Sequence, residues 1–303
     1  MTDAEAPLPF ASDGSGGGLP GEEFRTAGLV FGQLLGDPGR LPAGAWVAGL
    51  EPWWDVTRWD AHARSLRGLR RQLGRAGRCG VVVSWSWLRD ETSLDAAGQQ
   101  LAALLARWRA ACRMPPMAFA ASSRWEEPHA CAWLGLAWCG ERLVGAALAL
   151  PRAPGVWCLV HLVRDPEAPQ GTVELLVDKG MRALAGDGAR WVTLGLMPLE
   201  GPVPPLLARV RPALEGLFPF AGLAAFKRRF RPDLELSLLV VHPDLPVWVG
   251  VLRLLRAFTG VGFRRYARSW LRWAMGYRVG LLPEADALRG RLDATTRLEP
   301  IAT

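Results

Sequence analysis

The pattern of apolar and polar positions changes near residue 130, where strand-like segments begin. Segments 132–137, 143–150 and 156–163 are short and rich in apolar residues, which predicts three successive strands. The intervening sequence Cys-Gly-Glu-Arg at 139–142 predicts a tight hairpin turn between the first two strands. We therefore expect an antiparallel strand run in this part of the chain.

Other segments carry apolar residues at the spacing of a helix. Residues 94–112 place Leu101, Leu104, Leu105 and Trp108 at positions that share one helical side. The same periodicity, or a short apolar run, predicts the remaining elements. These are helices at 172–185, 204–217 and 222–230, a basic helical stretch at 59–78, and strands at 81–85, 191–196 and 234–241.

The order of these elements is typical of a layered α/β protein, because a strand run is followed by helix, strand, helix and strand. We predict an α/β fold with a mixed central sheet flanked by helices. The order is similar to that of GNAT-type acyltransferases, in which a splayed central sheet holds an acyl donor. Element order by itself is weak support for a function.

The pattern also suggests a division of the chain. Residues 1–21 are rich in Gly, Pro and Ser and are expected to be a flexible leader. Residues 22–129 are predicted to form an abbreviated first GNAT-like unit with the basic helix, and 130–245 the catalytic GNAT-like domain. Residues 246–303 mix Trp with Arg, which suits either a basic amphipathic helix at a membrane interface or a helix packed on the domain.

Charge and composition narrow the function only slightly. The formal net charge is +7 and comes mostly from arginine, which suits phosphate, although a GC-rich genome would give the same excess. The five cysteines are odd in number and lack Cys-x-x-Cys spacing, so neither a zinc site nor a disulfide framework is indicated. We expect no cofactor and no metal. No apolar stretch is long and uninterrupted enough to predict a spanning helix.

A rigid loop precedes the helix predicted at 172–185. Pro166, Pro169 and Gly171 restrict the loop, Thr172 can cap the helix, and Glu174 falls in its first turn. A carboxylate at this position stabilises the positive end of a helix dipole, so Glu174 has an ordinary structural interpretation. It is equally placed to contact a cationic substrate.

A second polar residue stands at the border of an apolar helical face. Positions 223, 226, 227 and 230 share one side of a helix, which places Lys227 beside two phenylalanines and a leucine. A lysine there can reach inward to an anion or to a carbonyl oxygen. The alternative is that Lys227 and the neighbouring arginines form a solvated basic face.

The basic stretch at 59–78 carries arginines at spacings of three and four. Arg64, Arg67, Arg71, Arg75 and Arg78 would lie along one stripe of a continuous helix. Such a stripe can follow a phosphate backbone, and tRNA is the favoured partner. Lipid headgroups and plain solvation are the alternatives.

Four blocks in the right order resemble the C-terminal domain of phosphatidylglycerol lysyl- and alanyltransferases. LVRDPEAPQGTVELLV (162–177) is similar to the family signature R-R-x-P-x-x-P-N-G-T-M-D/E-F-L, and WVTLGLMPL (191–199) to L-G-M-A-P-L. FPFAGLAAFKRRFRP (218–232) resembles Y-x-F-x-G-L-R-x-Y-K-x-K-F-x-P, and SLRGLRRQLGRA (65–76) resembles the family's basic helix. The resemblance covers roughly residues 46–241 and identifies a member without the transmembrane flippase of well-studied relatives.

The resemblance implies a role for each matched residue. Glu174 would hold the amino group of an aminoacyl ester or accept a proton, and Lys227 with Arg164 would stabilise an oxyanion. A mutual salt bridge is the alternative for Arg164 and Asp165. The implied substrate-binding residues are Asp165, Gly171, Thr172, Gly195, Pro198, Phe220 and Phe230. Contact with tRNA is assigned to Arg64, Arg67, Arg71, Arg75 and Arg229.

The function so implied is transfer of an aminoacyl group from aminoacyl-tRNA to a lipid hydroxyl, such as that of phosphatidylglycerol. A cytoplasmic enzyme at the inner face of the cell membrane is expected. One alternative is an acyl-CoA-dependent N-acetyltransferase, because residues 71–76 match the coenzyme A loop R/Q-x-x-G-x-G/A. That loop should follow a strand and open a helix, so inside a helical run the match is interpreted as accidental. A non-catalytic RNA- or membrane-binding relative is the other alternative.

Overall fold

A computed structural model of the protein describes residues 24–26, 29–34, 45–87, 91–112, 132–215 and 219–241, with single positions 249, 268 and 271. The leader expected at 1–21 and, apart from those three positions, the tail expected at 246–303 lie outside the described residues. Among the described residues, no helix combines the length and the apolar character needed to cross a membrane.

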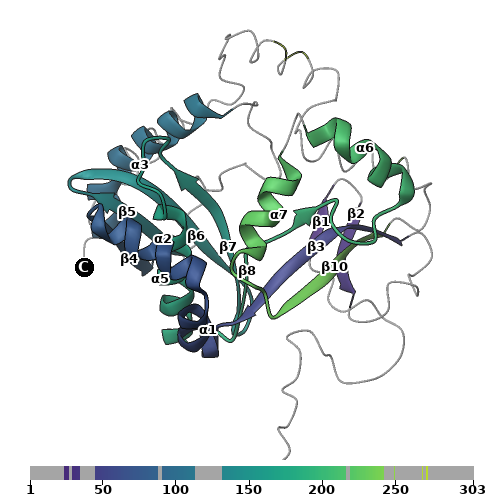
Figure 1. Ribbon diagram of the computed structural model, residues 1–303, viewed down its shortest axis with the longest axis horizontal. Helices are drawn as coiled ribbons and strands as arrows, with labels where there is room; N and C mark the ends of the chain where they lie inside the picture. The colour runs from purple at the N-terminus through teal and green to yellow at the C-terminus, as the bar shows by residue number, and fades with distance from the viewer. Residues whose placement is uncertain are drawn as a thin grey trace, which may run out of the picture.

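The described strands form one mixed sheet (Figure 1). Its spatial order is β1-β2-β10-β3-β8-β7-β6-β5-β4, with β9 paired to β3. Strands β7 and β8 run parallel, and the other pairs are antiparallel. The bounds are β1 Phe24–Thr26, β2 Leu29–Leu34, β3 Ala45–Asp55, β4 Val81–Trp87, β5 Trp133–Cys139, β6 Arg142–Ala153, β7 Val156–Arg164, β8 Trp191–Thr193, β9 Met197–Pro198 and β10 Leu234–Val241.

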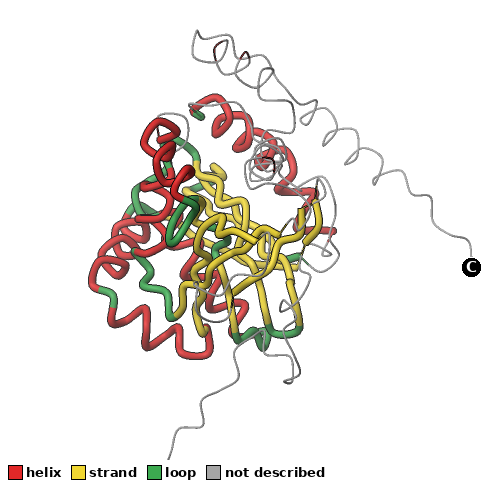
Figure 2. The backbone as a smooth tube through the Cα atoms, turned by 90° about the vertical axis from the view of Figure 1, so that its right-hand side faces the viewer, coloured by secondary structure: helices red, strands yellow, loops and turns green. Residues whose placement is uncertain are grey.

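Helices flank this sheet, and in the side view the strands form a continuous layer with most helices beside it (Figure 2). Val177, Met181 and Leu184 of α5 pack on one face, while Leu101 and Leu104 of α3 pack on the other. Helices α1 and α2 pack beside α5 on the same face of the sheet. The bounds are η1 Val56–Arg58, α1 Trp59–Ser65, α2 Arg67–Arg78, α3 Glu91–Ala111, α5 Thr172–Gly186, α6 Pro205–Glu215 and α7 Phe220–Arg228. The predicted α/β class with a mixed, helix-flanked sheet is confirmed.

Two predicted elements differ in the structure, since one is divided and the other ends early. The helical stretch expected at 59–78 is two helices, because Leu66 adopts an extended conformation (φ −85°, ψ 90°) and is buried. Leu66 lies in the same buried cluster as Val177 and Met181 of α5, so the bend places an apolar side chain in the core. The strand expected at 191–196 ends at Thr193, because Gly195 has a φ of 74° that turns the chain. Strands β4 and β5, which lie on either side of the proposed boundary at residue 129, pair in the same sheet. The division of the chain into two units stays a prediction.

A tryptophan fixes the distance between α5 and the sheet. The Trp85 ring lies against Gly135 of β5 and Gly180 of α5, where a Cβ added to either glycine would overlap it. Its Nε1 donates a hydrogen bond to the backbone oxygen of Leu176 (3.2 Å). Nearby, Trp59 donates to the buried carboxylate of Asp178 (3.0 Å) and attaches α1 to the same helix. The start of α5, where Glu174 lies, is therefore held firmly above the sheet.

Candidate active site where the sheet divides

The central sheet opens between β7 and β8. The two strands pair only over Val156–Cys158 and Trp191–Thr193, after which β7 continues to Arg164 while β9 pairs with β3 instead. His161, at a bulge in β7, has a φ of 52°, which is uncommon for a residue with a side chain. Figure 1 shows β7 and β3 diverging, with α7 between them. This is the splay that a GNAT-like fold predicts.

Lys227 reaches into this opening from α7. It lies in the last turn of the helix and is 6% exposed. Its Nζ donates hydrogen bonds to the backbone oxygens of Gly195 (2.9 Å) and Leu196 (2.8 Å), just after β8. An ammonium group carries three N–H donors, and these two bonds among the described residues leave one that can bind a substrate oxygen.

The environment of Lys227 changes its acidity. Burial lowers the pKa of Lys227 from 10.5 to about 8, because desolvation disfavours the charged form, while Cys158 and Glu51 oppose the change and Arg152 adds to it. At neutral pH the side chain is still mainly an ammonium. The chain has only one other lysine, the exposed Lys179. An arginine at 227 could not lose its proton in this range, so the two residues are not interchangeable here.

A buried polar cluster adjoins the lysine. Glu51 of β3 is 1% exposed and forms a salt bridge with Arg152 of β6 (2.9 Å). Thr193 of β8 donates its hydroxyl hydrogen to Glu51 (3.1 Å). The thiol of Cys158 on β7 is buried, which raises its pKa. The sequence prediction missed these residues, although Glu51 is the only charge in the apolar run 45–54 and could have been noticed there.

Glu174 lies in the first turn of α5 and is 8% exposed. Its Oε1 accepts a hydrogen bond from Nη1 of Arg229 (2.8 Å), the residue that directly follows α7. The first turn of α5 thus meets the C-terminal end of α7, and Glu174 and Lys227 are both buried rather than on the outer surface. They contact different partners, and the tunnel expected between them stays a prediction.

The loop before α5 corrects one expectation. The N-cap of α5 is Gly171, so Thr172 does not cap the helix and is its first residue. The Thr172 hydroxyl instead donates to the backbone oxygen of Pro169 (2.7 Å). Gly171 has a φ of 93°, and a Cβ added there would overlap the backbone oxygen of Gln72 in α2. The loop is therefore pressed against the basic helix.

Gly171 gives a stability prediction. Gly171→Ala should lower the free energy of unfolding by about 2 kcal/mol or more, because the left-handed backbone is strained for alanine and its Cβ has no room. The matched control is Gly186→Ala in the same helix, where an added Cβ meets nothing within 4 Å. Urea denaturation of both variants checks this. Equal stabilities of the two variants would contradict the packing described.

Arg164 and Asp165 are not joined through their side chains. Asp165 is fully buried, which by itself raises its pKa. Its carboxylate accepts hydrogen bonds from the backbone N–H of Glu167 (2.9 Å), from Arg107 (2.6 Å) and from Arg142 (2.9 Å), and these bonds lower the pKa below its usual value. Arg164 is exposed, and its Nε donates to the backbone oxygen of Asp165 (3.3 Å). Asp165 therefore pairs with Arg107 and Arg142 and not with the side chain of Arg164, so the expected salt bridge between Arg164 and Asp165 is not formed. The roles of Arg164 and Asp165 in catalysis and substrate binding stay predictions.

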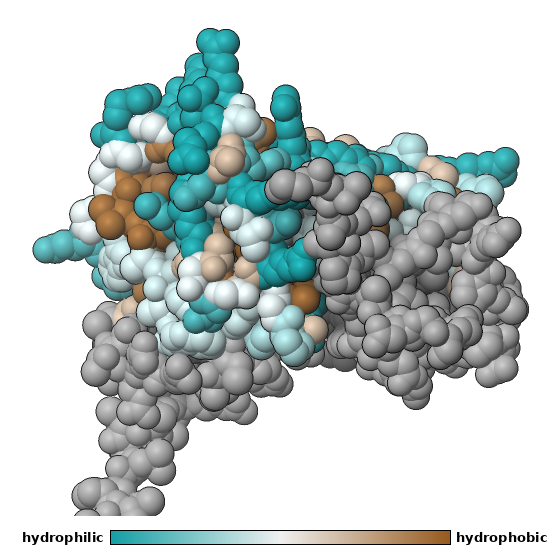
Figure 3. Space-filling model, turned by 90° about the horizontal axis from the view of Figure 1, so that it is seen from below, coloured by the Kyte–Doolittle hydropathy of each residue, from teal (hydrophilic) through white to brown (hydrophobic). Residues whose placement is uncertain are grey.

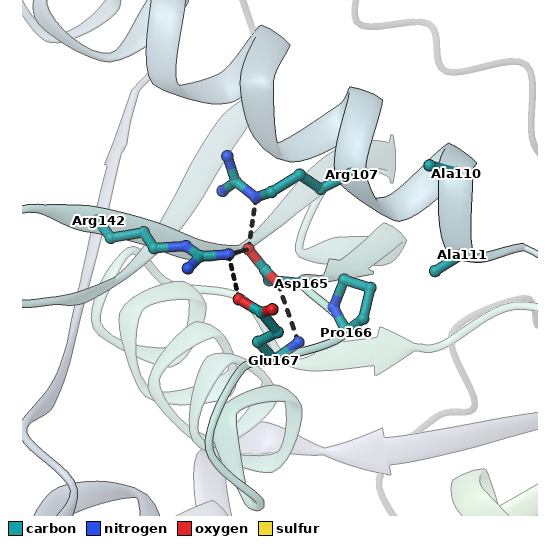
Figure 4. A pocket seen from close by; sticks show the side chains of 7 residues that line it. All are labelled: Arg107, Ala110, Ala111, Arg142, Asp165, Pro166 and Glu167. Atoms are coloured by element: carbon teal, nitrogen blue, oxygen red, sulfur yellow. Dashed lines mark hydrogen bonds and ion pairs between the residues drawn. The ribbon is translucent and has the colours of Figure 1, made fainter.

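A pocket of about 320 Å³ lies beside Asp165 (Figure 4). Arg107 and Arg142 line it, but both point to the carboxylate of Asp165, and Arg142 also pairs with Glu167 (2.8 Å). Ala110, Ala111 and Pro166 complete the lining. The two positive charges are matched by two negative ones, so this pocket does not favour an anion.

The remaining predicted substrate residues lie around the splay or in the core. The carbonyl of Gly195 holds Lys227, and Pro198 of β9 is half-buried opposite Gly49. Phe220 begins α7 and is half-buried. Phe230 is fully buried against the Trp54 ring, so the structure shows it as a core residue.

The predicted tRNA-binding arginines lie on three segments, because Arg229 follows α7 and the others lie on α1 and α2. Arg67, Arg71, Arg75 and Arg78 are exposed, share α2 and keep the helical spacing of one face. Arg64 is exposed but belongs to α1, beyond the break at Leu66, so the single continuous stripe was wrong. The guanidinium of Arg75 donates to the side chain of Gln170. Seen from below, the described surface is largely hydrophilic and is interrupted by apolar patches, the largest at the left (Figure 3).

The described residues contain no group of three or more His, Cys, Asp or Glu side chains that could hold a metal ion. A comparison with curated proteins gave no match. Among solved structures, the DUF2156 C-terminal domain of a candidate lysylphosphatidylglycerol synthetase from Agrobacterium fabrum is 18% identical, with a TM-score of 0.57 over 71% of this chain and 67% of that one. L-PGS from Bacillus licheniformis is 16% identical, with a TM-score of 0.54 over 71% and 66%.

These likenesses show a shared fold that spans about two thirds of each solved chain. The family model for the C-terminal region of phosphatidylglycerol lysyltransferase matches residues 49–240, which is more than half of the sequence. The match contains most of β3, the basic helix α2, the splay, Glu174 and Lys227. The chain belongs to the phosphatidylglycerol lysyltransferase C-terminal family.

Proposed function

We propose that this protein transfers an aminoacyl group from aminoacyl-tRNA to a lipid hydroxyl, such as that of phosphatidylglycerol. The observation that carries the proposal is the buried ammonium of Lys227 at the opening of the sheet, in a chain of this family. An activated ester needs no cofactor to react with an alcohol. What it needs is orientation and a positive group beside the carbonyl oxygen.

The chemistry follows from these groups. The lipid hydroxyl oxygen attacks the ester carbonyl carbon, and the carbonyl oxygen gains negative charge beside the third N–H of Lys227. The bond to the tRNA ribose oxygen then breaks, and the proton of the attacking hydroxyl ends on that oxygen. Glu174 either carries this proton or holds the amino group of the aminoacyl moiety. Arg229 keeps the Glu174 carboxylate in place and presents a partly exposed charge to tRNA.

The loop before α5 argues against the acyl-CoA alternative. A pyrophosphate binds at a helix start through backbone N–H groups. Here the amides of Glu167, Ala168 and Thr172 donate to Asp165 and Pro169, and the two prolines of the loop have no N–H, which leaves for a phosphate mainly the N–H groups of the first turn of α5. Glu167 and Glu174 add negative charge at this end. The alternative sequence match at 71–76 lies inside α2 and does not open a helix, which supports the interpretation that the match is accidental.

The exposed face of α2 is the proposed contact with tRNA phosphates. Replacing both Arg67 and Arg71 with glutamine should weaken tRNA binding several-fold and reduce the slope of log K against log salt by about 1.5. The matched control is Arg209→Gln, an exposed arginine on α6, which lies away from α2 in Figure 1. Filter binding over a salt series measures both quantities. Unchanged tRNA binding in the double variant would show that tRNA does not bind to this face of α2.

The function is tested by lipid mass spectrometry after expression in a host that lacks aminoacylated lipids. A new aminoacyl-phosphatidylglycerol is the expected product. We further propose that the protein works at the inner face of the cell membrane, where such an acceptor lies. If no aminoacyl lipid appears, the purified protein is assayed with aminoacyl-tRNA and a soluble alcohol. Deacylation of the tRNA only in the presence of that alcohol would show that the lipid acceptor is wrong while the transferase assignment stands.

A further inference from the structure

A continuous chain of hydrogen bonds connects the ion pair of buried Glu51 and partly exposed Arg152 to Lys227. Arg152 pairs with Glu51 (2.9 Å), and Glu51 accepts the hydroxyl hydrogen of Thr193 (3.1 Å). The Thr193 oxygen accepts the backbone N–H of Gly195 (2.9 Å). The carbonyl oxygen of Gly195 in turn accepts from Lys227 Nζ (2.9 Å). Four elements of the fold, β3, β6, β8 and α7, contribute to this chain.

The chain fixes a backbone conformation that would otherwise be free to rotate. Gly195 sits at a φ of 74°, and glycine reaches this region without steric cost but also leaves it easily. The Thr193 hydroxyl donates its hydrogen to Glu51, so the lone pairs of the Thr193 oxygen can accept the hydrogen bond from the Gly195 N–H. The carbonyls of Gly195 and Leu196 consequently face the lysine.

An apolar residue in place of Glu51 would avoid the desolvation of a buried carboxylate, whose partner Arg152 keeps 31% of its side chain exposed. A buried carboxylate paired with a partly exposed arginine contributes little to stability by itself, and its connection to Lys227 points to another role. We propose that Glu51 and Thr193 are positioning residues, which orient the ammonium of Lys227 through the Gly195–Leu196 turn. This inference rests on the proposed function of Lys227.

The same cluster sets the charge around the lysine. Lys227 faces Glu51 from β3, Arg152 from β6 and Cys158 from β7. The next two residues in sequence, Arg228 and Arg229, are paired with acidic residues. Glu51 raises the pKa of Lys227 and Arg152 lowers it. Removing the charge of Glu51 should thus lower the pKa of Lys227 below about 8, and removing that of Arg152 should raise it.

Nuclear magnetic resonance of lysine labelled with ¹³C at Cε tests the electrostatic part without any substrate. Two lysine signals are expected, and exposed Lys179 is the internal control. In Glu51→Gln the Lys227 titration should move to lower pH, and in Arg152→Gln to higher pH, with Lys179 unchanged in both. A Lys227 titration that stays in place in Glu51→Gln overturns the inference, even if the wild-type protein transfers nothing.

Kinetics of Thr193 variants test the positioning part. Thr193→Val keeps the shape but removes the hydroxyl, so kcat should fall at least tenfold while KM for aminoacyl-tRNA changes less than twofold. Thr193→Ser keeps the hydroxyl and should retain most of kcat. Equal losses in both variants would indicate packing and overturn the inference. If the wild type is inactive with every aminoacyl-tRNA while the Lys227 titration still moves, the proposed function fails and the network stands.

Discussion

Lys227→Met should lower the rate of aminoacyl transfer by about 100- to 1,000-fold, the usual cost of removing one donor to a developing oxyanion. The loss should appear in kcat rather than in KM, because the ammonium gains its partner only in the transition state. Single-turnover transfer from preformed aminoacyl-tRNA measures this step directly. In the wild type the rate should also fall above pH 8, where Lys227 loses its proton.

The chain supplies its own control for this experiment. Lys179→Met removes the other lysine, which is exposed on α5, and should leave the rate within twofold of wild type. The far-ultraviolet circular dichroism of both variants should be unchanged, since methionine fills a similar volume. A Lys227→Met enzyme that transfers at the wild-type rate would exclude Lys227 from the reaction.

Glu174→Gln should lower the transfer rate by about 100-fold, within the range found for loss of an acid–base group. Glutamine keeps the size of the side chain but neither accepts a proton nor neutralises an ammonium. Arg229 is half-exposed, so its charge stays hydrated without a partner, and adding Arg229→Met to this variant should restore none of the rate.

The two roles open to Glu174 differ in their substrate dependence. If it holds the amino group, an N-acetylated aminoacyl-tRNA should react poorly with the wild type and equally poorly with Glu174→Gln. If it carries the proton, acetylation should not matter and only the variant should be slow. Glu141→Gln, an exposed carboxylate in the β5–β6 turn, is the control. A Glu174→Gln enzyme with unchanged kinetics for both donors would contradict either role.

Local periodicity accounts for the parts of the fold that could be predicted. The strand at Leu234–Val241 has the predicted bounds, and α3, α5 and the three strands β5 to β7 lie within a few residues of the predictions. These elements are specified by which neighbours share a face, and that information is present in the sequence. Glu174 and Lys227 were found because they lie in motifs of the family.

Contacts between distant segments could not be predicted in the same way. The insertion of β3 between β8 and β10 brings Glu51 to Thr193, 142 residues away in sequence, and nothing in either segment specifies the partner. The break of the basic helix at Leu66 depends on burial against α5, which overrides helical propensity. The misassigned cap at Thr172 has a similar cause, because the contact of Gly171 with α2 places the cap one residue earlier.

The central claim is that Lys227 assists the transfer of an aminoacyl group from tRNA to a lipid. The most direct measurement incubates the purified protein with tRNA charged with a mixture of radiolabelled amino acids and with vesicles of phosphatidylglycerol, and counts label in the lipid extract. We expect label that depends on intact tRNA, persists in Lys179→Met and is lost in Lys227→Met. Label that is absent from the lipid, or that is equal in the two lysine variants, would contradict the claim.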